Sequence, residues 1–285
     1  MNFARDHDEL VRAKLATYHY VEEPDDNDFT RYVVLLDLLK RLVPRRRYKV
    51  HLSREIQANP KARELKSVLD EVIEQLRSGQ SIAPYLSKAA NDLTAQDGLL
   101  VHWGIHHLHL SPAASKGADG FVARADYLLF FRVDATNAYL IDIVPHKASA
   151  LFVREELVRT VDRNWPALHH EIARSGAVPL RQLTDRENKS LRKKSTNTPV
   201  QTDSRIVIPA FGAMSSGHSL DAVMAADGTA LELQRLELLI RINYAVWFGR
   251  TTDWVTALRL IETRDEGYVI SDGSSGKVRF FERLA

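Results

Sequence analysis

The chain has 285 residues, of which 45% are hydrophobic and 27% are charged, a composition typical of a globular protein that can bury a sizeable core. Its formal net charge is +2, a balance that does not by itself indicate a nucleic-acid partner. The lack of cysteine excludes disulfides, thiolate nucleophiles and cysteine-ligated zinc. The charged start predicts no signal peptide, and no apolar run reaches about 18 residues, so we expect no membrane partner and a cytoplasmic location.

Residues 1–95 predict a helical N-terminal region. The expected elements are helices over 5–20, about 28–43, 60–78 and about 82–90, with a short strand over 48–52. The third of these helices has the clearest boundaries, because Asn59 is suited to the N-cap, Pro60 to the first turn and Gly79 to the C-terminal end. Between them, apolar residues recur at helical spacing.

Residues 96–183 predict a central antiparallel β-sheet with one helix. The expected elements are one or two strands over 99–110, strands over 127–133 and 138–144, and a helix from 151 that ends or bends at Pro166 and continues to about 175. The segment Asp134-Ala-Thr-Asn137 separates two β-rich runs, which is typical of a β-hairpin.

The rest of the chain predicts a basic linker over 184–204 and a small C-terminal α+β module over 205–285. Residues 184–204 are polar and almost free of apolar side chains. The module is expected to contain a strand over 205–209, a helix over 229–246, and strands over 257–262, 267–270 and 278–281. The whole chain is therefore expected to have an α+β fold.

Histidines gather in one segment of the chain. Four of the eleven lie within the eight residues from His102 to His109, and His146 ends a later strand. Because side chains alternate between the faces of a strand, His107 and His109 should share one face and point into a groove, whereas His106 should point into the core. The face expected to carry the later histidine is formed by Leu140, Asp142, Val144 and His146. The pattern leaves the role of His102 open.

Imidazole side chains suit acid–base catalysis, because they exchange protons near neutral pH. We expect a metal-independent cleavage of a phosphodiester, in which one histidine deprotonates a ribose 2′-hydroxyl and another protonates the leaving oxygen. The candidate catalytic residues are His107, His109, His146, Arg124 and Lys147. The two cations would stabilise the negative charge of the phosphate in the transition state.

The same three histidines also allow a metal centre. A His-x-His pair on a strand, together with a third histidine or Asp142, is typical of a transition-metal site. Under the first interpretation no cofactor is needed. Under the second, His107, His109 and His146 would bind Zn²⁺ or Mn²⁺ in a metal-dependent hydrolase or nuclease.

The hairpin segment resembles the central strands of RelE-type toxins. The resemblance is carried by Arg124-x-x-Tyr127-Leu-Leu-Phe-Phe-Arg132, by Asp134, and by Tyr139-Leu-Ile-Asp-Ile-Val-Pro-His146-Lys147. It implies an RNA-cleaving sheet, in a toxin or phage-defence setting. RelE-type toxins are much shorter than this chain, and the segment 104–110 is not part of their pattern. Together with 84–88 and 97–100, that segment resembles instead a family of bacterial proteins to which we attach no function.

Two compact basic clusters are candidate phosphate contacts, since arginine and lysine provide the sequence-independent part of nucleic-acid binding. They consist of Arg45, Arg46, Arg47, Arg192, Lys193 and Lys194. Each cluster taken alone is more typical of a solvated surface than of a phosphate-binding site. With the histidine site they favour RNA as partner. The remaining alternative is a non-enzymatic adaptor that binds nucleic acid or protein, with the C-terminal module as an interaction or homo-oligomerisation surface.

Overall fold

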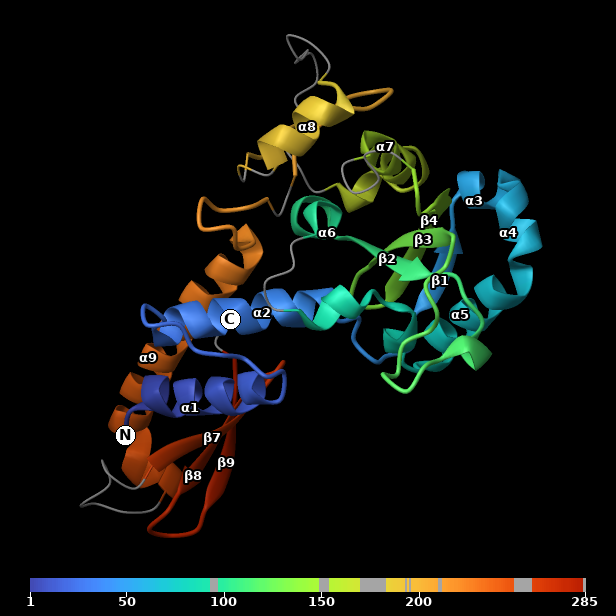
Figure 1. Cartoon of the computed structure of the whole chain (residues 1–285). Coiled ribbons are helices and arrows are strands. Elements are labelled where there is room, and N and C mark those ends of the chain that lie inside the picture. Colours follow the sequence, from blue (N-terminus) through green and yellow to red (C-terminus); the bar gives the residue numbers. More distant parts are fainter. Residues whose placement is uncertain are drawn as a thin grey trace. The chain divides into compact units, whose positions relative to one another are not determined.

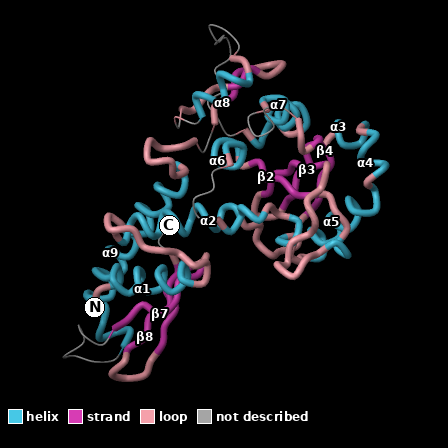
Figure 2. The backbone as a smooth tube through the Cα atoms, in the orientation of Figure 1, coloured by secondary structure: helices cyan, strands magenta, loops and turns pink. Residues whose placement is uncertain are grey.

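The structure, a computed structural model, describes residues 1–92, 97–148, 154–169, 183–192, 194, 196–209, 212–248 and 258–283 (Figure 1). It contains helices and separate small sheets, which confirms the predicted α+β class (Figure 2). The chain forms two compact units: unit 1 is Met1–Asp37 with Asp221–Ala285, and unit 2 is Leu38–Leu220. The predicted boundaries at 95/96 and 183/184 do not coincide with this division.

Unit 1 joins the two ends of the chain. Its elements are α1 (Phe3–Ala16), most of α2 (Asp28–Arg41), α9 (Leu220–Phe248), β7 (Leu258–Arg264), β8 (Gly267–Asp272) and β9 (Val278–Glu282). The strands form an antiparallel sheet in the order β7-β8-β9. Phe3 is fully buried among side chains of α9 and this sheet, and the Asp6 carboxylate accepts a hydrogen bond from the backbone N–H of Leu260 (3.0 Å). The first helix is therefore part of the C-terminal module.

Unit 2 is built around a four-stranded sheet in the order β1-β4-β3-β2. Its strands are β1 (Lys49–Leu52), β2 (Ile105–His109), β3 (Tyr127–Val133) and β4 (Asn137–Pro145). Strands β2, β3 and β4 are antiparallel, and the hairpin between β3 and β4 confirms the predicted one. Strand β1 pairs in parallel with β4, so the sheet is mixed and not wholly antiparallel as predicted.

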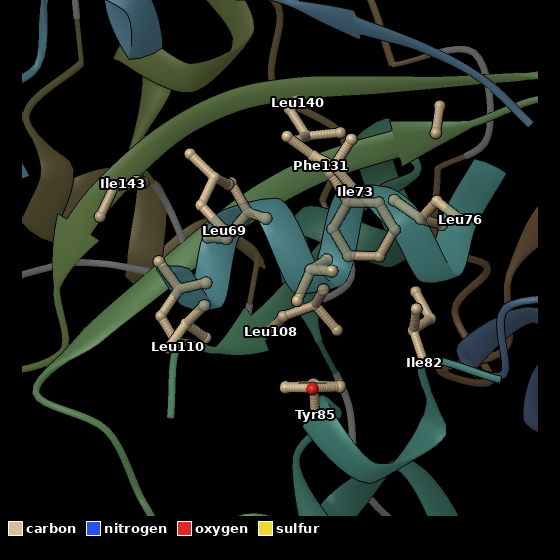
Figure 3. Close-up of a cluster of buried hydrophobic side chains, with 14 of the residues drawn as sticks. Leu69, Ile73, Leu76, Ile82, Tyr85, Leu108, Leu110, Phe131, Leu140 and Ile143 are labelled. Atoms are coloured by element: carbon tan, nitrogen blue, oxygen red, sulfur yellow. The ribbon is translucent and has the colours of Figure 1, made fainter. Parts of the chain in front are cut away.

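Helices cover both faces of this sheet. One face packs against α3 (Arg54–Ala58), α4 (Pro60–Glu64) and α5 (Lys66–Ser78). Figure 3 shows side chains of α5, such as Leu69 and Ile73, close to Leu108, Phe131 and Leu140 of the strands. The opposite face packs against α6 (Gly98–Trp103) and α7 (Glu155–Asn164). The site described below lies on the second face.

Two predictions about the region before β2 need correction. Residues 98–103 form α6 and not a strand, because the Asp97 carboxylate accepts hydrogen bonds from the N–H groups of Leu99 and Leu100, and Gly104 ends the helix with a left-handed φ of 65°. The segment 82–90 forms two short 3₁₀ turns, η1 (Ala83–Tyr85) and η2 (Lys88–Asn91), in place of a helix.

The predicted linker at 184–204 also contains regular structure. Helix α8 (Asp185–Arg192) and strand β5 (Val200–Gln201) lie within it, and β5 pairs with β6 (Ile206–Val207). Asn188 is fully buried and donates a hydrogen bond to the Glu155 carboxylate (2.5 Å), while Val200 is buried in the core. The polar composition of this segment predicted a linker, whereas the structure contains a helix that a buried polar side chain, Asn188, attaches to α7.

Three remaining elements complete the description. The turn η3 (Ala113–Ser115) lies between β2 and β3, and η5 (Pro166–Leu168) follows α7. The predicted helix beyond residue 169 lies outside the described residues. Helix α9 begins at Leu220, earlier than predicted. Among the helices that the structure describes, none combines the length and apolarity needed to cross a membrane.

Candidate functional site

The register of the sheet places the histidines of β2 beside the end of β4. In the register of β2 with β3, His107 lies opposite Phe130, and His109 lies opposite Leu128. The backbone N–H of His146 donates a hydrogen bond to the carbonyl of Asp126, just before β3 (2.7 Å). His107, His109 and His146 are partly exposed. The structure therefore brings the side chains of these three histidines together, as the sequence predicted.

A β-bulge changes part of the predicted face of β4. Phe130 pairs with Asp142 and Phe131 with Leu140, so Ile141 is an extra residue in β4. As a result Leu140 faces the core formed with α3, α4 and α5, whereas Val144 faces the core formed with α6 and α7. The prediction that these two residues share a face with His146 is wrong for Leu140, because strict alternation was assumed along a strand that contains an irregularity.

The imidazole rings contact one another. The rings of His109 and His146 are stacked, with centroids 5.5 Å apart and planes 29° apart. The ring of His107 meets that of His109 edge-on at 6.4 Å. Three titratable side chains therefore lie within direct electrostatic range of one another.

Asp97 is a member of the site that the sequence did not reveal. Its Oδ2 lies 3.0 Å from Nδ1 of His107, while its Oδ1 caps α6. A carboxylate at Nδ1 favours the tautomer that carries the proton there and leaves a lone pair on Nε2. Asp97 precedes a helix that was predicted as a strand, so its capping role and its approach to His107 were both missed.

The other two histidines accept hydrogen bonds. The N–H of Ala125 donates to Nδ1 of His109 (3.4 Å), so neutral His109 carries its proton on Nε2. A guanidinium has donors alone, so Nη2 of Arg124 donates to Nε2 of His146 (3.3 Å). Each ring of the cluster therefore has a different polar neighbour: Asp97 for His107, the Ala125 N–H for His109 and Arg124 for His146.

The surroundings of His109 and His146 favour the neutral form of these two rings in the free protein. Burial, followed by the nearby charges of His107, His146 and Arg124, lowers the pKa of His109 to about 4. Burial and then the Arg124 guanidinium lower the pKa of His146 below its ordinary value. Positive neighbours thus make this a site in which an added negative group would be stabilised.

The cluster opens into a cavity of about 520 Å³. Its lining residues are Arg41, Leu86, Ser87, Lys88, Ala89, Ala90, Asp97, Leu100, His106, His107, His109, Phe121, Val122, Arg124 and His146. The Lys88 ammonium pairs with Asp119, and the Arg41 guanidinium donates to the carbonyl of Asp92. The cavity therefore combines imidazoles, one carboxylate and three cationic side chains.

The other predicted site residues lie around this cavity. Lys147 is exposed beside His146 and does not belong to the lining, although its charge contributes to the low pKa of His146. His106 is buried and stacked on Phe131, and burial lowers its pKa to about 4. His102 is buried within α6.

The basic clusters lie elsewhere. Arg45, Arg46 and Arg47 are exposed before β1, and Nη1 of Arg46 donates to the carbonyl of Ala135 in the β3–β4 turn (3.3 Å). In the second cluster Lys194 is exposed, whereas Lys193 and the side chain of Arg192 lie outside the described residues.

The position of Arg124 opposes a metal ion at His146, one of the three histidines of the predicted metal centre. Within the described part of the chain, no group of three or more histidine, aspartate or glutamate side chains is placed to hold a metal ion. The Nε2 lone pair of His146 faces a guanidinium, whose positive charge opposes a cation at the same nitrogen. Asp142 accepts a hydrogen bond from Asn59 and is not among the residues that line the cavity.

Comparison of the chain with models of protein families, with curated proteins and with solved structures found no match. The functional argument is therefore made from the residues of the cavity.

Proposed function

We propose that unit 2 cleaves RNA without a metal, by acid–base catalysis in this cavity. The observation that carries the proposal is the arrangement of Asp97 and His107 beside His109, His146 and Arg124. The choice of RNA is supported by the cationic lining and by the resemblance to RelE-type toxins. The toxin or phage-defence setting is part of that same resemblance.

His107 is the proposed general base. With Asp97 at Nδ1, its Nε2 takes the proton from a ribose 2′-hydroxyl, and the oxygen then attacks the neighbouring phosphorus. A 2′,3′-cyclic phosphate forms as the bond to the 5′-oxygen breaks. Asp97 stabilises the imidazolium that results, as the carboxylate of a catalytic triad does.

Arg124 and His109 are the proposed phosphate contacts. The guanidinium supplies positive charge and paired donors for phosphate oxygens, and the Nε2–H of neutral His109 supplies a further donor. Because its pKa is about 4, His109 acts at neutral pH as a hydrogen-bond donor and not as a proton source.

His146 is the proposed general acid. When a phosphate engages Arg124, the Nε2 of His146 loses its donor and gains a negative neighbour, which raises its pKa and favours the protonated ring. The imidazolium then gives its proton to the leaving 5′-oxygen. Proton removal and delivery thus fall to two histidines on either side of His109.

The test is cleavage of a single-stranded RNA by the purified protein in EDTA. We expect products that end in a 2′,3′-cyclic phosphate and no cleavage of a strand with a 2′-deoxy sugar at the scissile position. His107→Asn and His146→Asn should each lower the rate about 100-fold or more, since general acid–base catalysis contributes that much. His19→Asn is the matched control, because His19 is exposed in unit 1 and its positive φ of 57° suits asparagine.

Two outcomes would contradict this proposal. Cleavage that is lost in EDTA and restored by Zn²⁺ or Mn²⁺ would favour the metal-dependent alternative. A wild-type protein that leaves RNA intact with and without these metals would favour the adaptor.

A further inference from the structure

A row of aromatic side chains lies at the opposite end of the same sheet face. His51 of β1 pairs in register with Tyr139 of β4, and their rings are stacked with centroids 5.0 Å apart and planes 14° apart. Trp165, which follows α7, packs against Tyr139 at 5.1 Å and 59°. All three side chains are partly exposed. We call these three residues the aromatic row.

Hydrogen bonds fix the first two rings of the aromatic row. Nε2 of His51 lies 2.9 Å from the amide oxygen of Asn137, and the hydroxyl of Tyr139 donates to the Asp134 carboxylate (3.0 Å). The same carboxylate accepts from the backbone N–H groups of Thr136 and Asn137, so its charge is shared among donors of the hairpin turn. The rings are therefore held in place before any ligand binds, which reduces the entropy lost on binding.

Cationic side chains surround the aromatic row. Lys49, two residues before His51 on β1, is exposed. Arg132 is the register partner of Tyr139 on β3, and Arg46 is held at the β3–β4 turn through the carbonyl of Ala135. Positively charged side chains thus lie beside the partly exposed rings of the aromatic row.

We propose that the aromatic row binds the bases of a single-stranded nucleic acid while Lys49, Arg46 and Arg132 contact its phosphates. Aromatic rings stack with any base, and interspersed cations follow the backbone, which is the usual design of a sequence-tolerant single-strand site. A duplex keeps its bases stacked on one another, so it offers these rings no free base face.

The aromatic row is separate from the cavity. Between Tyr139 and His146 the same sheet face is covered by α6 and α7, and its side chains Phe130, Ile141 and Val144 are buried beneath these helices. Binding of a single strand by the aromatic row therefore does not rest on the proposed function.

The test is binding of a fluorescein-labelled oligothymidine of about 12 nucleotides, a typical single-strand site size, measured by fluorescence anisotropy. DNA has no 2′-hydroxyl, so the measurement is independent of the proposed cleavage. We expect His51→Ala and Trp165→Ala each to weaken binding about tenfold, whereas His51→Phe, which keeps a stacking ring, retains most of the affinity. Lys49→Ala should reduce the dependence of affinity on salt.

Tyr127→Ala is the matched control, because Tyr127 is a partly exposed tyrosine of β3 with the Lys61 ammonium 5.1 Å from its ring centroid, away from the aromatic row. It should bind as the wild type does. Circular dichroism shows whether each variant is folded. Wild-type affinity in folded His51→Ala and Trp165→Ala, or equal affinity of the wild type for duplex DNA, would overturn the proposal and leave the cleavage proposal standing.

Discussion

At the scale of single residues, the site is a set of imidazoles whose protonation is controlled by their neighbours. Arg124 lowers the pKa of both His109 and His146, whereas Lys147 lowers that of His146. Arg124, which contacts the ring of His146, therefore affects two histidines. Lys147, the next residue in the sequence, affects only His146 of the two.

This difference gives a residue-scale prediction. Removal of a positive neighbour makes protonation easier, so Arg124→Ala should raise the pKa of both His109 and His146. Lys147→Ala should raise the pKa of His146 and leave that of His109 in place. Nuclear magnetic resonance titration of the imidazole carbon-bound protons measures both. If Arg124→Ala moved neither value, the guanidinium would not act on these rings, and its proposed role at the phosphate would lose its basis.

Residue patterns identified most of the site but not its carboxylate. Alternation along β2 correctly separated His107 and His109 from His106, because that strand is regular. Asp97 could not be found in this way, since its approach to His107 depends on the turn from α6 into β2 at Gly104. Residue spacing predicts which side chains share a face of one helix or strand, whereas the contact between Asp97 and His107 joins two different elements.

At the scale of elements, the two ends of the helix predicted over residues 60–78 were identified correctly. Asn59 caps α4 and Gly79 ends α5 with a left-handed φ of 80°, as the sequence predicted, although the helix is interrupted at Leu65. The helix α6 was missed because its six residues are too few to show helical periodicity among apolar neighbours. The parallel pairing of β1 with β4 joins strands far apart in the chain, which no local pattern encodes.

Asn59 gives the element-scale prediction. Its side-chain oxygen caps α4 at the N–H of Lys61, and its Nδ2 donates to the Asp142 carboxylate and to the carbonyl of Ile143. Asn59→Ala removes all three bonds and should lower the free energy of unfolding by about 1–3 kcal/mol. Asn59→Ser keeps a capping oxygen and should recover part of this loss in denaturant titrations. Equal losses in the two variants would mean that the cap contributes nothing.

At the scale of the whole molecule, one compact unit is formed by segments from the two ends of the chain, which the order of the sequence does not show. Phe3 and Asp6 complete the core and hydrogen bonding of β7 at the other end of the chain, so the N-terminal helix belongs with unit 1. The spacing of apolar residues within one segment does not show which distant segment covers its apolar face. Each unit contains a buried histidine whose pKa is strongly lowered, His7 in unit 1 and His106 in unit 2.

These buried histidines predict that acid destabilises the fold. His7 in unit 1 lies edge-on to Tyr32 at 4.4 Å, and His106 in unit 2 is stacked on Phe131. Burial lowers the pKa of each from 6.5 to about 4. Between these values the unfolded chain binds more protons than the folded one, so the free energy of unfolding falls as the pH falls through this window. Above it both states hold neutral rings, and the stability is fully present.

Each histidine should contribute a slope of up to about 1.4 kcal/mol per pH unit within the window. His7→Phe and His106→Phe replace a titrating ring with one that cannot be protonated, so each variant should show a shallower loss of stability on acidification. The two residues lie in different units, so the double variant should show the sum of the two reductions. Denaturant unfolding followed by circular dichroism from about pH 7 down to about pH 4 measures these slopes. A His7→Phe protein whose stability fell with pH as steeply as that of the wild type would show that His7 is protonated within the folded state, and the same comparison applies to His106→Phe.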